Sequence, residues 1–128
     1  MEEFRKTVFK VPQEYLDLIN QIFEIEKKAL NLKEENSILR NVNKLKTLIE
    51  EDLFKSVRSL TGFSYHNPID EPYNETRTDC EANITGESTE NLFIVEVIKP
   101  IIYCNYLDNE RPVKSIVQKA IVIAESSK

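Results

Sequence analysis

The spacing of apolar residues changes once along this chain, near Gly62. Upstream, apolar residues recur every three or four positions, as they do along one face of a helix. With the polar Asn36 as the exception, they fill two positions of a heptad repeat: Tyr15, Ile22, Ala29 and Asn36 at one, and Leu18, Ile25, Leu32 and Leu39 at the other. Downstream of Asn91, apolar runs have the length of strands. The pattern predicts an α+β chain in which a long N-terminal coiled-coil or bundle helix precedes a small antiparallel β domain.

A helix of this length cannot bury its apolar face alone. It is therefore either two helices folded back on each other or one helix paired with a second chain. Gly62 is expected to cap the last helical turn. We take residues 1–62 as a helical dimerisation stalk and predict a homodimer. The expected seam consists of Leu18, Ile22, Ile25, Leu32, Asn36 and Leu39. Asn36 in this seam either fixes the register of the pair or is exposed at a helix break.

Residues 63–128 are predicted to form a small all-β domain that binds a partner. Three antiparallel strands are expected, at residues 92–98, 101–107 and 116–124. Pro100 separates the first two strands, and the polar residues 108–112 form a turn before the third. Residues 63–90 contain Pro68, Pro72 and Gly86, so we expect mostly loop with short strands there.

Composition narrows the class of protein. The 128 residues carry a formal charge of −5, which argues against a general nucleic-acid-binding protein. Only two glycines are present, which argues against a glycine-rich phosphate loop. No apolar run approaches the ~20 residues of a membrane span, so no membrane association is expected. Cys80 and Cys104 are far apart in the sequence, and a reducing cytoplasm is the expected location.

Candidate catalytic or metal-binding side chains are few. His66 is the only histidine, and no paired cysteines could complete a zinc site with it. One acidic cluster follows, formed by Asp70, Glu71, Glu75, Asp79 and Glu81. Two of its carboxylates could act as a glycosidase pair or a weak cation site, but a solvated loop is the favoured interpretation. We therefore expect no enzyme, no metal and no cofactor.

Four short motifs occur in a recognisable order. They are Pro-Ile-Asp-Glu-Pro-Tyr-Asn at 68–74, Cys-Glu-Ala at 80–82, Val-Glu-Val-Ile-Lys-Pro at 95–100, and Val-Gln-Lys-Ala-Ile-Val-Ile-Ala at 117–124. In this order, after a helical segment, they resemble GrpE, the nucleotide exchange factor of DnaK-type chaperones. The first resembles the family's P-x-G-E-x-F-D-P segment, and the second its H-E-A triplet. The last two resemble the strand before its Gly-Tyr pair and the closing R-P-A-x-V-x-V strand.

The resemblance implies a homodimeric co-chaperone that promotes ADP release from a DnaK-type ATPase by wedging its nucleotide cleft open. It implies that Arg111 takes the place of the family's hairpin arginine, with Lys114, Lys99 and Tyr103 contributing to the same partner surface. The chain departs from the family at Ile101 and Ile102, which replace the Gly-Tyr pair, and at Gln118 and Lys119, which replace Arg-Pro. The alternative is a coiled-coil dimeric adaptor whose β domain binds another protein without exchange activity.

Overall fold

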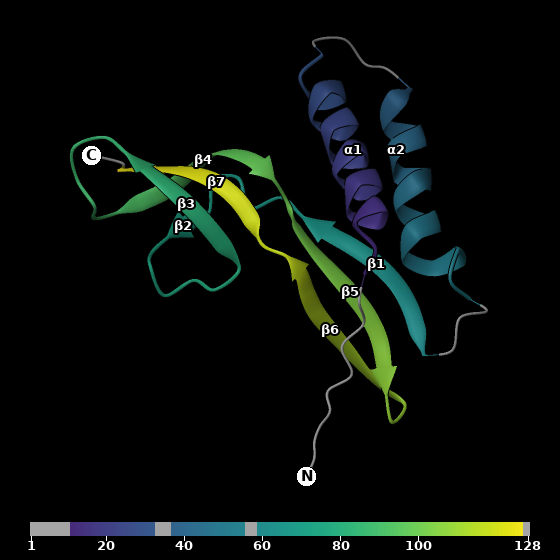
Figure 1. The fold of residues 1–128 in the computed structure, drawn as a ribbon. Coiled ribbons are helices and arrows are strands. Elements are labelled where there is room, and N and C mark those ends of the chain that lie inside the picture. Colours follow the sequence, from purple (N-terminus) through teal and green to yellow (C-terminus); the bar gives the residue numbers. More distant parts are fainter. Residues whose placement is uncertain (1–10, 33–36, 56–58, 127–128) are drawn as a thin grey trace.

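The computed structural model describes residues 11–32, 37–55 and 59–126. Two helices come first, α1 (Gln13–Leu30) and α2 (Ile38–Thr47), and α2 continues into a π-helical turn, η1 (Leu48–Asp52). The strands that follow are β1 (Leu60–His66), β2 (Pro72–Tyr73), β3 (Cys80–Thr85), β4 (Leu92–Lys99), β5 (Ile101–Asp108), β6 (Arg111–Gln118) and β7 (Ala120–Ser126). Figure 1 shows the helices beside β1 and most strands extending away from them.

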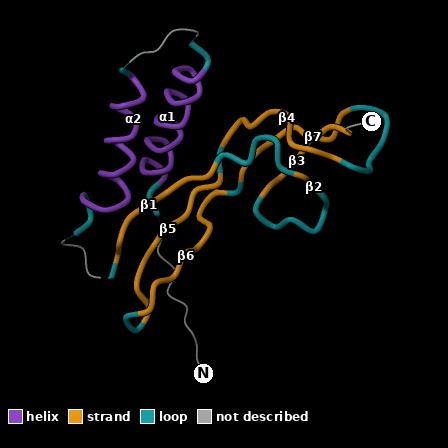
Figure 2. The backbone as a smooth tube through the Cα atoms, turned by 180° about the vertical axis from the view of Figure 1, so that it is seen from behind, coloured by secondary structure: helices purple, strands orange, loops and turns teal. Residues whose placement is uncertain are grey.

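The prediction of one long coiled-coil helix is wrong. α1 has 18 residues and α2 has 10, and the two lie side by side next to β1 (Figures 1 and 2). No single long helix forms, because the rest of the chain itself covers the inner face of the two helices. One buried cluster combines residues of all these elements: Ile19, Ile22, Val42, Ile49, Phe63, Ile102 and Cys104. Burial of a large aliphatic or aromatic side chain stabilises a fold by roughly 1.5–3 kcal/mol. The contacts of the helices with the rest of the chain therefore account for the short helical hairpin.

The prediction of a purely antiparallel β unit is also wrong. The strands form two sheets, sheet A in the order β1-β5-β6 and sheet B in the order β2-β4-β7-β3. β3 runs parallel to β7, with pairs from Cys80↔Ala120 to Thr85↔Glu125. Residues 63–90, expected to be mostly loop with short strands, contain the end of β1 together with β2 and β3.

One long hairpin connects the two sheets. β4 and β5 form one arm, β6 and β7 form the other, and the arms are interrupted at Pro100 and Lys119. The predicted strand 116–124 is therefore two strands in different sheets. The expected hairpin turn is confirmed but is shorter than predicted, because Asp108 already pairs with Arg111. Its two loop residues, Asn109 and Glu110, both have positive φ, as a type I′ turn requires.

Gly62 does not cap a helix, because it lies within β1. The turn η1 passes directly over it. A Cβ atom at this position would lie 2.3 Å from the carbonyl oxygen of Glu50 and 2.5 Å from that of Ile49. The sequence change at Gly62 thus marks a close backbone approach between η1 and β1.

A second buried cluster joins α1 to sheet B. Phe23 of α1 lies in this cluster with six strand residues: Cys80, Ile94, Val97, Ile101, Ala120 and Val122. The Phe23 ring also packs edge-on against Tyr65 of β1, with 5.9 Å between ring centroids. The helical hairpin and both sheets therefore share continuous packing.

Within the described residues, none of the helices has both the length and the apolar character needed to cross a membrane.

Candidate partner-binding surface

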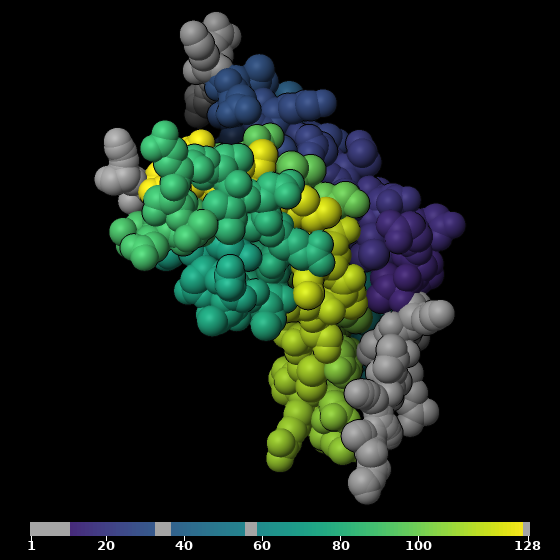
Figure 3. Space-filling view, turned by 60° about the vertical axis from the view of Figure 1, so that its left-hand side comes forward, coloured from purple at the N-terminus to yellow at the C-terminus, as the bar shows by residue number. Residues whose placement is uncertain are grey.

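The β5–β6 hairpin projects from the body of the molecule, as its yellow-green strands show in Figure 3. Lys114 of β6 places its Nζ 4.6 Å from the ring centroid of Tyr103 on β5. A cation over an aromatic face at this distance is a favourable contact. Arg111 is exposed at the first position of β6, beside the turn. The structure thus brings Lys114 and Tyr103 together and places Arg111 on the same hairpin.

Lys99 does not belong to this group. It ends β4 in sheet B, where it lies opposite Ile121, and Pro100 separates it from β5. Two exposed apolar side chains accompany the hairpin cations instead: Leu107 near the turn and Ile116 opposite Tyr103. The hairpin therefore presents aromatic, aliphatic and cationic groups together, a composition found at protein interfaces.

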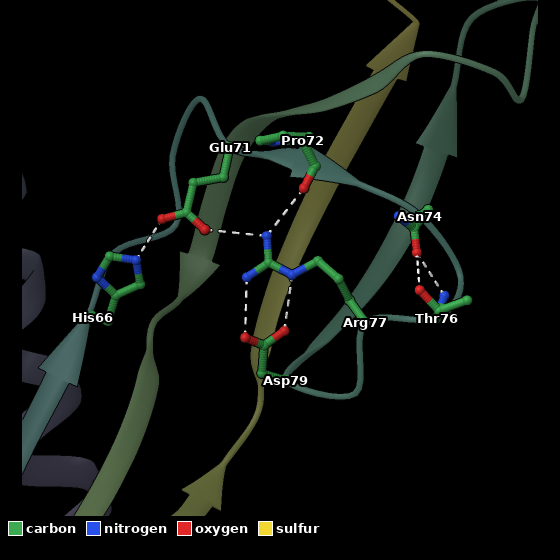
Figure 4. Close-up of polar contacts among 7 residues, drawn as sticks. All are labelled: His66, Glu71, Pro72, Asn74, Thr76, Arg77 and Asp79. Atoms are coloured by element: carbon green, nitrogen blue, oxygen red, sulfur yellow. Dashed lines mark hydrogen bonds and ion pairs between the residues drawn. The ribbon is translucent and has the colours of Figure 1, made fainter.

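Arg77 binds several groups of residues 68–82, the segment that contains the first two sequence motifs (Figure 4). Arg77 donates from Nε and Nη2 to the two carboxylate oxygens of Asp79, at 2.9 and 3.0 Å. Its Nη1 lies 3.1 Å from the Glu71 carboxylate and donates to the Pro72 carbonyl at 3.1 Å. Glu71 also contacts His66 through its other carboxylate oxygen. Two of the five acidic residues expected to be solvated are therefore bound by Arg77.

Sequence reasoning missed Arg77, although a signal was present. It is the only lysine or arginine between Arg58 and Lys99, within a strongly acidic stretch. A lone cation among carboxylates tends to attract several of them. Backbone bonds also fix the segment to β4, from Asp70 N–H to the Ile94 carbonyl and from Ile94 N–H to the Glu71 carbonyl.

Ionisation in this region follows from these contacts. The hydrogen bonds from Arg77 hold the pKa of Asp79 below its ordinary value. Burial raises the pKa of the Cys80 thiol to about 11, so it is protonated at neutral pH. Burial, and next the nearby Asp79 charge, raises the pKa of Tyr103. The Tyr103 hydroxyl is therefore neutral at physiological pH.

Three of the positions at which the chain departs from the GrpE pattern make internal contacts. Ile101 and Ile102 are fully buried, one in each cluster. Gln118 forms a reciprocal amide pair with Asn20 of α1, at 2.9 and 3.0 Å, and donates to the Pro100 carbonyl at 3.0 Å. Ile101, Ile102 and Gln118 thus connect the helices to the bend of the long hairpin.

The six predicted seam residues separate into different environments. Ile22 is 2% exposed inside the chain's own core. Leu18, Ile25 and Leu32 are 53%, 43% and 52% exposed, and Leu39 is half-buried. Asn36 lies outside the described residues. Ile22 and Ala29 of one heptad position are thus buried within the chain, whereas Leu18, Ile25 and Leu32 of the other form an exposed ridge on α1 and the residues after it.

No grouping of three or more metal-ligating side chains occurs in the described parts of the chain. The cysteines Cys80 and Cys104 are free and buried. In comparisons with known proteins, no family model, no curated protein and no solved structure matches this chain.

Proposed function

We propose that this chain is a GrpE-like co-chaperone that binds a DnaK-type ATPase through its β5–β6 hairpin and promotes release of ADP. The observation that carries the proposal is the exposed hairpin surface, where Lys114 covers the Tyr103 ring at 4.6 Å and Arg111 lies beside the turn. The ordered sequence motifs supply the family, and the attachment of residues 70 and 71 to β4 gives the first motif a fixed position beside the sheet.

The mechanism we propose is differential binding. An ATPase whose nucleotide cleft opens and closes releases ADP from the open state. A protein that binds the open state more tightly shifts the equilibrium toward it and needs no catalytic residue. Arginine and tyrosine suit such a contact because both combine apolar area with hydrogen bonding. Lys99 lies apart from this group, and we assign it no more than a peripheral contribution.

We further propose that two copies pair through the ridge of Leu18, Ile25 and Leu32, because these side chains are about half exposed and follow the heptad spacing. The pair would be two helical hairpins packed together. We also propose a cytoplasmic location for the protein, because Cys80 and Cys104 are both free.

Calorimetric titration against a purified DnaK-type ATPase domain tests the proposal. Binding is expected to be tightest without nucleotide and to weaken when ADP is added, since the coupling between two ligands is reciprocal. Arg111→Ala should weaken binding about tenfold or more, the range of an interface anchor. Lys28→Ala, an exposed cation on α1, is the matched control. Equal affinity with and without ADP would contradict the exchange mechanism.

A dimeric adaptor without exchange activity is the second candidate. It is favoured by one observation, namely that Ile101, Ile102 and Gln118 make internal contacts at positions where the family carries other residues. For an adaptor, the ATPase domain would show no binding, while the hairpin surface would still bind another protein.

A further inference from the structure

The outward side of sheet B carries apolar side chains that the chain does not cover. Inward-facing residues of β4 and β7, such as Ile94, Val97 and Val122, are at most 3% exposed. The alternate side of the same strands, which we call the outer face of sheet B, contains Phe93, Val95, Ile98, Ile121 and Ile123. Phe93, Val95 and Ile98 are 38–46% exposed. Figure 1 shows sheet B extending away from the helical hairpin.

Two bulges in β4 enlarge this face. The pairing of β4 with β7 shifts register between Ile94 and Glu96, and again between Val97 and Lys99. Each shift inserts one extra residue, Val95 in the first case and Ile98 in the second. Bulges turn a side chain away from strict alternation. Both inserted residues are apolar and exposed, so β4 places two more apolar groups on the solvent side than regular pairing would.

Carboxylates surround the apolar centre. Glu81 of β3 lies opposite Ile121, Glu96 of β4 lies opposite Ile123, and Glu125 of β7 lies opposite Phe93. All three glutamates are exposed. Residues 78–98 contain no lysine or arginine, and Lys99 is the only cation in the strand pairs of this face. The outer face of sheet B therefore complements an apolar surface with a basic border.

We propose that the outer face of sheet B binds a basic amphipathic helix of a partner protein. A helix laid across the strands presents apolar residues at spacings of three and four, so it can contact β4 and β7 together. A peptide strand added at the free edge of β3 would lie beside β3 and would not reach Val95 or Ile98, because β7 separates β3 from β4. This surface contains none of Arg111, Lys114 and Tyr103, so it is separate from the hairpin surface.

Fluorescence anisotropy with a labelled model peptide tests this proposal. The probe is an 18-residue peptide of leucine and lysine, with leucine at helical spacing. A peptide of the same composition with alternating leucine and lysine is the control. We expect saturable binding of one helical peptide per chain and affinity that falls with salt. The double variant Val95→Thr with Ile98→Thr should bind about tenfold more weakly, since each 1.4 kcal/mol is a factor of ten.

Threonine keeps the branched shape that strands favour, so the double variant should retain the circular dichroism of the parent. Leu53→Thr, which changes an exposed apolar residue after η1, should leave affinity unchanged. Equal binding of the alternating peptide, or unchanged binding by the double variant, would overturn the proposal. Self-association of the chain that the double variant abolishes would overturn it as well, because a second copy would then occupy the face.

Discussion

Single side chains hold this fold together at positions where its segments meet. Gly62 admits the backbone of η1 against β1, Arg77 binds two carboxylates of the acidic segment, and Gln118 connects α1 to the bend of the long hairpin. The sequence alone indicated Gly62 as a boundary but assigned it to a helix cap. The contact of Gln118 could not be assigned from spacing, because its partner Asn20 is 98 residues away in the sequence. The partners of Arg77 are close to it in the sequence, and its isolation among carboxylates was the signal that could have found them.

The first prediction concerns Gly62. Gly62→Ala should lower the free energy of unfolding by at least about 2 kcal/mol, because the added Cβ would overlap two carbonyl oxygens of η1. Denaturant unfolding measures this loss. Gly86→Ala is the matched control, since its Cβ would meet only a flexible side chain at 3.9 Å and would cost about 1 kcal/mol for its positive φ. A loss at Gly62 no larger than at Gly86 would refute the close approach.

A second prediction concerns the pH dependence of the Arg77–Asp79 contact. The pKa of Asp79 is lower in the folded protein than in the unfolded chain, so its contribution to stability is present above about pH 4 and is lost as the pH falls below that. Asp79→Asn should cost about 1–2 kcal/mol at pH 7 and progressively less below pH 4. Chemical unfolding of both proteins from pH 7 to pH 2 measures the difference. A constant difference across this range would show that the carboxylate charge is not involved.

At the level of secondary-structure elements, the sequence pattern predicted helices followed by strands but not how these elements are arranged. Helical periodicity is the same for a coiled coil and for a hairpin packed on the chain's own sheet, so the burial of Ile22 could not be distinguished from a dimer contact. The parallel pairing of β3 with β7 joins segments about 40 residues apart, which local patterns do not encode. Likewise, residues 116–124 divide at Lys119 because the two halves pair in different sheets, which the polarity of the sequence does not indicate.

The third prediction separates the two sides of α1. Ile22→Ala should destabilise the chain by about 2–4 kcal/mol, because it leaves a cavity in the shared core. Ile25→Lys should leave the helical circular dichroism unchanged but convert the proposed dimer into a monomer, because Ile25 is exposed on the ridge. Analytical ultracentrifugation distinguishes these cases. A parent protein that sediments as a single chain would contradict the dimer and leave the role of Ile22 unaffected.

At the scale of the whole molecule, the helical hairpin and the β unit are joined by polar as well as apolar contacts. Lys27 donates to the Val97 carbonyl at 2.9 Å, and the Tyr65 hydroxyl donates to Glu26 at 2.7 Å. Burial, and next the bond to Glu26, raises the pKa of Tyr65, so its hydroxyl remains a donor. A partner that binds the β5–β6 hairpin would therefore act on a body whose helices are firmly attached.

The fourth prediction tests that attachment. Gln118→Ala should destabilise the protein by about 1–3 kcal/mol, because Asn20 and the Pro100 carbonyl both lose a partner. Asn20→Ala combined with Gln118→Ala should cost less than the sum of the single changes, because the two amides act as a pair. Denaturant unfolding of the four proteins gives the coupling free energy. Strict additivity would rule out the amide pair as the connection.

We propose above all that the β5–β6 hairpin opens a DnaK-type ATPase, and the rate of ADP release measures this opening most directly. A DnaK-type ATPase loaded with fluorescent ADP is mixed with excess unlabelled nucleotide in a stopped-flow instrument, with and without this protein. We predict a release rate that rises with protein concentration and reaches a plateau, and a much smaller rise with the combined change of Arg111→Ala and Lys114→Ala. A release rate that this protein leaves unchanged at saturating concentration would contradict the account.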